Sequence, residues 1–278
     1  MESKIISTIT TILKSKAVQD YIAAAESIHP GEGYPFVNYF GVNYRGDEVL
    51  NVKIYFSFFR RLKEEDIKKL IPNTEVFLKH YDKWLDAKTH DMQHTGCTFA
   101  LKVTADLKPT YYFHYRLPGA AGKLPKNISL NQLEQNEHNN TISYEFNDDK
   151  VLEKNYYLLF DKTTVKNCLE KYKIDFLIKQ NYLPDLIEYT ETEKWDKIIL
   201  AIADKDMQKK YMNSLPEKNM NQVINYFCNK YQLMTASSSI YNDLKTRAVY
   251  FLDDMPSVYL TNSNTIFRLK NTLFKGIL

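Results

Sequence analysis

Extended hairpin-like segments alternate with helical segments five times along this sequence of 278 residues. In the first hairpin, Arg45-Gly46-Asp47 joins two runs rich in strand-forming residues. The five segments read PFVNYFGVNYRGDEVLNVKIYFSFF, TGCTFALKVTADLKPTYYFHYRL, NTISYEFNDDKVLEKNYYLLF, WDKIILAIADKDMQKKYMN and TRAVYFLDDMPSVYLTN. An amphipathic helical pattern begins the chain, and others are expected at about 63–91, 163–190 and 217–233.

Ten antiparallel strands with helices between the hairpins can close into a barrel, which removes exposed sheet edges. We therefore expect an α+β fold: a ten-stranded antiparallel β-barrel of five hairpin repeats surrounded by a ring of α-helices. No linker-like composition divides the sequence, so residues 1–278 are expected to form a single domain. The one loop-like insertion, at 118–140, is expected to contain a short helix capped by Ser129.

A tyrosine recurs at the same position in the second predicted strand of every hairpin: Tyr55, Tyr112, Tyr157, Tyr211 and Tyr259. Two residues earlier, on the same strand face, the sequence has a polar residue: Lys53, Thr110, Asn155, Lys209 and Ser257. The opposite face is mostly apolar, except at Gln208 and Lys210 in the fourth strand. If helices cover the apolar face, the tyrosines and their polar companions point into the barrel. Lys102 and Arg247, in first strands, are further candidates for the interior.

An alternative explanation is an open, helix-covered sheet whose polar face is simply solvated, since tyrosine is common in strands. The recurrence of tyrosine with a polar companion in all five hairpins favours a polar interior instead.

Composition excludes several other classes of protein. The 37 basic and 34 acidic residues nearly balance, at a net charge of +3, which does not favour nucleic-acid binding. Three cysteines without paired spacing indicate neither a zinc site nor a disulfide framework, and the histidines lack metal-ligand spacing. We expect no membrane span, since the sequence has no run of about 20 apolar residues. The N-terminal segment does not resemble a signal peptide, so a cytoplasmic protein is expected.

Lysines beside tyrosines suit one kind of chemistry. Ammonium groups and tyrosine hydroxyls can bind a diphosphate. If that diphosphate leaves from an allylic carbon, aromatic faces can stabilise the remaining carbocation by roughly 0.5–2 kcal/mol each. The same rings exclude water that would quench the cation.

The sequence resembles the αββα-barrel (PT-barrel) aromatic prenyltransferases, which include the dimethylallyltryptophan synthase group. The resemblance lies in the hairpin–helix repeats and in the pairs Lys53-x-Tyr55, Asn155-x-Tyr157 and Lys209-x-Tyr211. The resemblance implies transfer of an isoprenoid group from an allylic diphosphate, of dimethylallyl or geranyl type, to an aromatic small molecule or peptide side chain. It implies that the prenyl diphosphate binds Lys53, Tyr55, Lys102, Thr110, Tyr112, Asn155, Tyr157, Lys209, Tyr211, Arg247, Ser257 and Tyr259. No metal is obligatory, because DDxxD motifs are absent, but Mg²⁺ can accompany the diphosphate.

Other features of the reaction stay open at this stage. The first strand has Val37 or Tyr39 where the fungal members of the family place a glutamate, so the acceptor is not identified. Candidate bases are Glu145, Glu153 and His114. A non-catalytic barrel that binds a hydrophobic or aromatic ligand is the second hypothesis.

Overall fold

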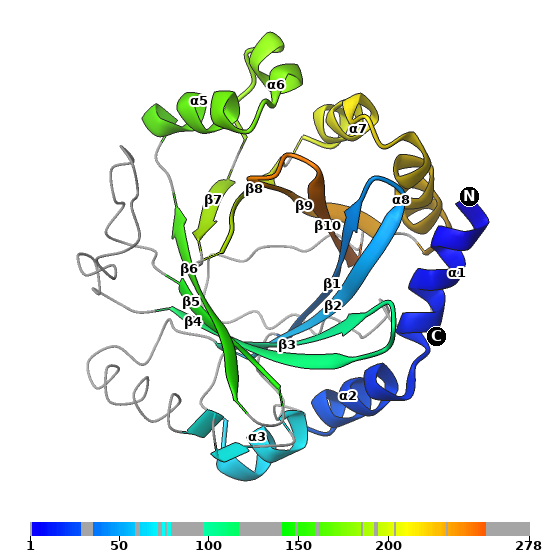
Figure 1. The fold of residues 1–278 in the computed structure, drawn as a ribbon, viewed down its shortest axis with the longest axis vertical. Coiled ribbons are helices and arrows are strands. Elements are labelled where there is room, and N and C mark those ends of the chain that lie inside the picture. The colour runs from blue at the N-terminus through cyan, green and yellow to red at the C-terminus, as the bar shows by residue number, and fades with distance from the viewer. Residues whose placement is uncertain are drawn as a thin grey trace, which may run out of the picture.

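The computed structural model describes residues 2–28, 36–58, 62–71, 74–75, 77–78, 97–116, 141–147, 150–159, 162–184, 186–191, 194–202, 204–231 and 233–253. Figure 1 shows a curled sheet with helices on its outer side. The strands are β1 (Phe36–Arg45), β2 (Glu48–Phe58), β3 (Cys97–Thr104), β4 (Pro109–Arg116), β5 (Thr141–Phe146), β6 (Val151–Leu159), β7 (Leu186–Glu191), β8 (Asp196–Ala201), β9 (Leu233–Tyr241) and β10 (Thr246–Asp253). The helices in these ranges are α1 (Glu2–Leu13), α2 (Lys16–Ser27), α3 (Glu64–Leu70), α5 (Lys162–Lys171), α6 (Asp175–Lys179), α7 (Lys205–Ser214) and α8 (Lys218–Tyr231).

Each strand pairs antiparallel with the strands next to it in sequence, and β10 also pairs with β1. In that last pairing Val42 lies opposite Val249, so the two ends of the sheet meet as a barrel. The expected α+β barrel-like architecture is confirmed. The β1–β2 turn lies where Arg45-Gly46-Asp47 indicates, and Gly46 has the positive φ of 58° that this turn requires.

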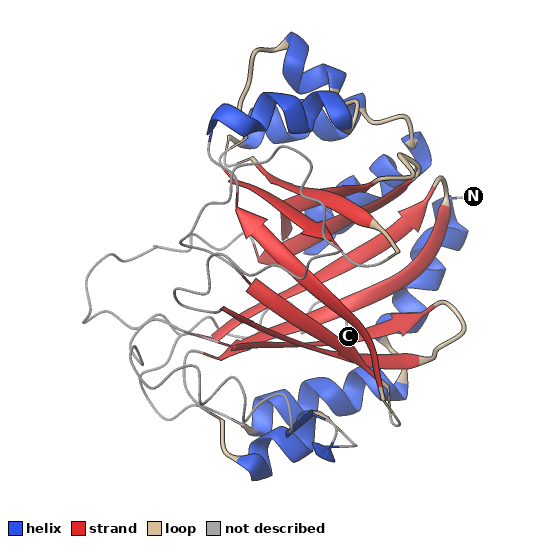
Figure 2. Ribbon diagram, turned by 60° about the vertical axis from the view of Figure 1, so that its left-hand side comes forward, coloured by secondary structure: helices blue, strands red, loops and turns tan. Residues whose placement is uncertain are grey.

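The outer face of the sheet is apolar because strand side chains alternate between the two faces. Each of the first four strands has a fully buried phenylalanine there: Phe40, Phe56, Phe99 and Phe113. Figure 2 shows helices along this outer side. The apolar stripe of α1, with Ile5, Ile9 and Ile12, recurs at the helical period and joins the same core. Burying each such side chain stabilises the fold by roughly 1.5–3 kcal/mol.

The fourth hairpin differs from the prediction. The expected second strand, which contains Lys209 and Tyr211, is helix α7, and β8 pairs instead with the preceding strand β7. Asp204 caps α7, because its carboxylate accepts a hydrogen bond of 2.7 Å from the Met207 amide. Lysine, glutamine and methionine follow it, and all three favour helices. The first strand of the fourth hairpin, β7, lies where the end of the 163–190 helix was predicted.

The fifth hairpin lies earlier in the sequence than predicted. The serine-rich residues 235–239, which precede the predicted fifth hairpin, belong to strand β9, and the expected first strand is β10, the second strand. The turn between them is held by Asp243, whose carboxylate accepts hydrogen bonds from the amides of Lys245 and Thr246, at 2.9 and 2.7 Å. Ser257, Tyr259 and the predicted helix at 118–140 lie outside the described residues.

The other predicted helices are partly confirmed. The N-terminal pattern forms α1 and α2, and the one at 217–233 forms α8. The pattern at 63–91 begins as α3, and most of its remainder lies outside the described residues. None of the helices in the described ranges has the length and apolar character needed to cross a membrane.

Arg247 points away from the barrel interior, contrary to expectation. It lies opposite Tyr44 on the outer face, and its Nε donates to Glu217 Oε1 at 2.9 Å. The two side chains are only 11% and 9% exposed, so this ion pair is buried between the sheet and the α7–α8 connection. Its contribution is therefore structural.

Replacing Arg247 with alanine should lower the free energy of unfolding by about 3 kcal/mol, because the Glu217 carboxylate loses its buried partner. Urea denaturation followed by circular dichroism measures this loss. The matched control is Lys16→Ala, which breaks the exposed Lys16–Asp20 pair and should change stability by less than about 0.5 kcal/mol. Equal effects of the two substitutions would contradict a stabilising role for the buried Arg247–Glu217 pair.

Candidate functional site

The inner face of the barrel is polar over most of its described positions. Residues directly opposite each other on paired strands share a face, so the register identifies this surface around the sheet. Lys53 pairs with Lys102, Lys102 with Thr110, and Glu145 with Glu153. We call this surface the inner face; its ionisable members with described side chains are Tyr39, Lys53, Tyr55, Lys102, Tyr112, His114, Glu145, Glu153, Lys197, Tyr241 and Tyr250.

Glu145 on β5 joins side chains from two neighbouring strands of the inner face. Its carboxylate accepts hydrogen bonds from Lys102 of β3 and from Thr110 and Tyr112 of β4, with 2.8 Å between Thr110 Oγ1 and Glu145 Oε1. Burial raises the pKa of this carboxyl, but the neighbouring ammonium groups of Lys102 and Lys53 outweigh burial and hold it below its usual range. Glu145 is therefore an ionised, fully engaged carboxylate.

Two further lysines approach the same region from other strands. The Lys53 ammonium lies 4.2 Å from the centroid of the Tyr112 ring, a cation–π geometry. Lys197 of β8 is 2% exposed and donates to the Tyr250 hydroxyl at 3.4 Å. Burial lowers the pKa of Lys53 to about 8, and the positive charges of Lys197 and Lys102 add to this effect. The Lys53 ammonium group is therefore repelled electrostatically by those of Lys102 and Lys197, which come from two other strands of the inner face.

Tyrosine rings form a compact cluster beside these lysines. Tyr39 and Tyr55 stack with ring centroids 4.3 Å apart and planes 9° from parallel. Tyr250 meets them edge-on, at 6.5 and 6.1 Å. The ring of Tyr250 lies against Gly41, where an added Cβ would be 2.6 Å from Tyr250 Cδ1. The absence of a side chain at Gly41 therefore sets the position of this ring.

Glu153 and His114 differ in their ability to act as a base. Burial raises the pKa of Glu153, and its negatively charged neighbour Glu145 raises it further. Burial lowers the pKa of His114 to about 3, helped by Lys53 and Lys197, so this imidazole is neutral at physiological pH. A carboxyl group with a raised pKa beside an ionised one is the arrangement that separates acid–base roles in known sites. Glu153 is therefore the best-placed base of the three candidates.

The structure brings together most of the residues that the sequence indicated. Lys53, Tyr55, Lys102, Thr110, Tyr112 and Asn155 share the inner face with the three candidate bases. Asn155 is buried and donates to Ser143 Oγ at 2.9 Å. Tyr157 follows it in β6 opposite Thr190, and its side chain lies outside the described set.

Besides Arg247, two predicted site residues lie off the inner face. Lys209 is exposed on α7, and Tyr211 is buried in the core between that helix and the outer face. Neither belongs to the inner face, because the helix that carries them packs outside the barrel (Figure 1).

Lys197, Tyr241 and Tyr250 were not predicted from the sequence, and Tyr39 was noted only as a residue near the position of the family's glutamate. Tyr250 occupies the second-strand position that the misplaced fifth hairpin assigned to Tyr259. Lys197 was missed for a similar reason: its strand, β8, is the second strand of the fourth hairpin and not the first, as predicted. Two sequence signals could have placed these hairpins correctly. Asp204 is a helix cap that ends the fourth hairpin, and Asn242-Asp243 marks the turn of the fifth.

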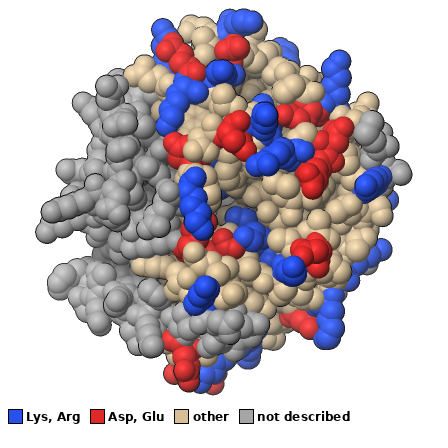
Figure 3. Space-filling model, viewed as in Figure 1, with Lys and Arg blue, Asp and Glu red and all other residues tan. Residues whose placement is uncertain are grey.

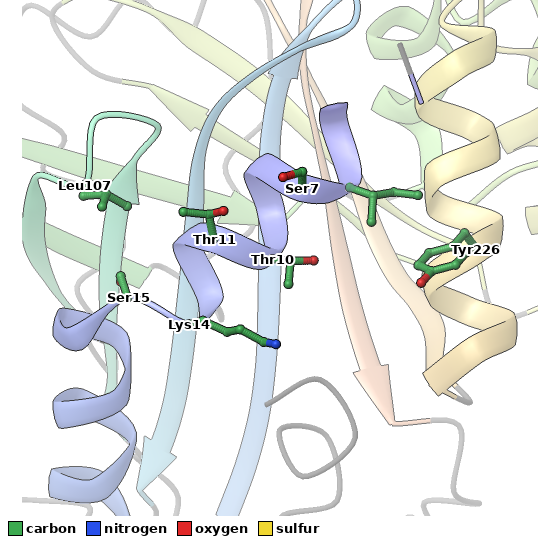
Figure 4. A pocket seen from close by; sticks show the side chains of 8 residues that line it. Ser7, Thr10, Thr11, Lys14, Ser15, Leu107 and Tyr226 are labelled. Atoms are coloured by element: carbon green, nitrogen blue, oxygen red, sulfur yellow. The ribbon is translucent and has the colours of Figure 1, made fainter. Parts of the chain in front are cut away.

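The outer surface has a separate groove of about 620 Å³ (Figure 4). It lies between α1, the β3–β4 turn and α8, and its lining includes Ile6, Leu107 and Tyr226. Lys14 is the one charged side chain among its lining residues. The lining of this groove therefore has neither the carboxylates nor the group of lysines that the inner face provides.

Neither a protein-family model nor a curated protein matches this chain. Within the described ranges, no three histidine, cysteine or acidic side chains gather as metal ligands would. Basic and acidic side chains are mixed on the face viewed in Figure 3.

Replacing Lys197 with methionine should raise the pKa of Lys53 by about half a unit to one unit, because a neighbouring positive charge is removed. A pH titration of the lysine ¹³Cε resonances by NMR measures this pKa. Lys210→Met, which removes an exposed charge from α7, is the control and should leave the titration unchanged. An unaltered midpoint in the Lys197 variant would show that the two ammonium groups do not interact.

Proposed function

We propose that this protein is an aromatic prenyltransferase. It moves an isoprenoid group from an allylic diphosphate, of dimethylallyl or geranyl type, to an aromatic small molecule or peptide side chain. The observation that carries the proposal is the approach of three lysine ammonium groups to a cluster of tyrosines on the inner face. An anionic leaving group and a carbocation need these two environments next to each other.

The diphosphate binds Lys53, Lys102 and Lys197. Ammonium groups form charge-assisted hydrogen bonds to phosphate oxygens, which are roughly twice as strong as neutral ones. Tyr250 adds a hydroxyl beside Lys197, since the two groups already contact each other at 3.4 Å. These contacts stabilise the negative charge that develops when the allylic C–O bond breaks.

The tyrosine rings protect the cation that this cleavage leaves. Tyr39, Tyr55 and Tyr250 contact one another and exclude water from their faces. An aromatic carbon of the acceptor attacks the cation and forms the new C–C bond. The acceptor carbon then loses its proton to Glu153, which restores the aromatic ring.

This function brings further expectations with it. They include a barrel of five hairpin repeats within a ring of helices, in a single domain of residues 1–278. Mg²⁺ can accompany the diphosphate but is not required. The protein would act in the cytoplasm, on small molecules or peptides, without nucleic-acid or membrane partners.

A binding protein without turnover is the second candidate. The engagement of Lys102 by Glu145 favours it, because this pair already neutralises one of the three cations. Incubation with dimethylallyl and geranyl diphosphate and a panel of aromatic acceptors separates the two candidates. A transferase gives a product heavier by one prenyl unit in mass spectrometry, whereas a binding protein gives a complex and no product.

Lys197→Ala should weaken binding of the prenyl diphosphate at least about 10-fold, which is the loss expected for one charge-assisted hydrogen bond. Calorimetric titration measures this affinity. Lys209→Ala is a matched control, since it removes a lysine from the exposed face of α7 and should leave affinity unchanged. Equal losses in both variants, or none in either, would place the diphosphate away from the inner face.

A further inference from the structure

Glu145 occupies the position that an incoming anion would compete for. Both of its oxygens are engaged: Oε1 accepts from Lys102 and Thr110, and Oε2 accepts from Tyr112. Its side chain is 6% exposed, so solvent cannot screen it effectively. Lys102 and Tyr112 are donors of the kind that a diphosphate needs. The protein therefore already holds an anion of its own among them.

A second carboxylate lies directly beside the first. Glu153 is opposite Glu145 in the β5–β6 register, with its side chain on the same face. The negative charge of each carboxylate disfavours ionisation of the other, so the two titrate as a coupled pair. Without a ligand, the lysines balance both charges.

An added anion changes this balance. When a diphosphate takes up the positive charge of the lysines, the two carboxylates lose part of their compensation and gain a negative neighbour. Both changes favour the protonated form of a carboxyl group. The least costly response is the transfer of a proton from solvent to a carboxylate oxygen, which forms one O–H bond without oxidation or reduction.

We propose that binding of a diphosphate to the inner face is coupled to uptake of a proton by the Glu145–Glu153 pair. The inference depends on the proposed function for the choice of anion. Its consequence is a diphosphate affinity that increases as pH falls through the range in which the pair binds its proton. Glu145 is then a positioning residue that competes with the ligand for Lys102 and Tyr112.

Other charged and titratable groups face the pair and must be separated from it. They are Lys53 of β2, Lys102 of β3, Tyr112 and His114 of β4, Lys197 of β8, Tyr241 of β9, Tyr250 of β10 and Lys194 before β8. Lys53, with a pKa of about 8, also gains a proton when an anion binds at higher pH. Before the diphosphate binds, Lys53 is already protonated at pH 6, and His114, with a pKa of about 3, is neutral. The measurement is therefore made at pH 6.

The test is calorimetric titration of inorganic diphosphate at pH 6, in two buffers of different ionisation enthalpy. The difference between the two binding enthalpies gives the number of protons taken up. We expect the wild type to take up about 0.5–1 proton more than the double variant Glu145→Gln/Glu153→Gln. Glu153→Gln alone should lose at least about half of that difference. The ligand's own titration is common to all these proteins, so it does not enter the comparison.

Controls separate this coupling from a loss of structure. Glu170→Gln removes an exposed carboxylate from α5 and should match the wild type. Thermal unfolding shows whether each variant is folded. If the double variant does not fold, the comparison of the wild type with Glu153→Gln is decisive, because Glu153 is partly exposed and its replacement disturbs the fold less. Equal proton uptake in the wild type and in folded Glu153→Gln, or no diphosphate binding by the wild type, would overturn the proposal.

The coupling and the proposed function can fail independently. Proton-coupled diphosphate binding without any prenylated product would reject the transferase and keep the coupling. Prenyl transfer by the wild type, with the same proton uptake in wild type and variants, would reject the coupling alone.

Discussion

The alternation of side chains along a strand, combined with a sheet that curls back on itself, is the constraint on which this structure depends. The apolar side chains of the described helices and of the outer face of the sheet form one core, so the other side chains of these strands face the interior of the barrel. Polar residues are thereby concentrated on a surface that is largely shielded from solvent. Lys53, Glu145 and Lys197 are each less than 9% exposed for this reason.

Burial makes charge compensation obligatory at this surface. An uncompensated ionised group in a protein interior changes its protonation state or destabilises the fold. Here Lys102 and Tyr112 share the carboxylate of Glu145, while Lys53 lies over an aromatic ring and retains a proton less readily. The groups that compensate these buried charges are also those that we propose to bind a ligand. Stability and function are therefore coupled through a single set of hydrogen bonds.

The sequence predicts the first three hairpins and their inward residues well, because their turns carry strong local signals. Gly46 in the first turn and Asn147 in the third are examples. It fails at the fourth and fifth hairpins, where a tyrosine at the expected spacing, Tyr211, belongs to a helix. Serines in β9 also oppose the prediction, since serine is a weak strand former and only pairing with β8 and β10 holds it extended. Contacts such as Tyr39 of β1 with Tyr250 of β10 depend on closure of the barrel, which no local pattern encodes.

The pairing of β1 with β10 has a consequence for how the molecule is made. Val42 and Val249 meet only when nearly the whole chain is present, so the sheet of a nascent protein remains open during most of its synthesis. Contacts between residues so distant in sequence slow folding, because a long loop must close before they form. The edges of β1 and of each newly added strand stay available to other chains until then. The protein is thus exposed to aggregation mainly during its synthesis, and the pairing of β10 with β1 ends that exposure.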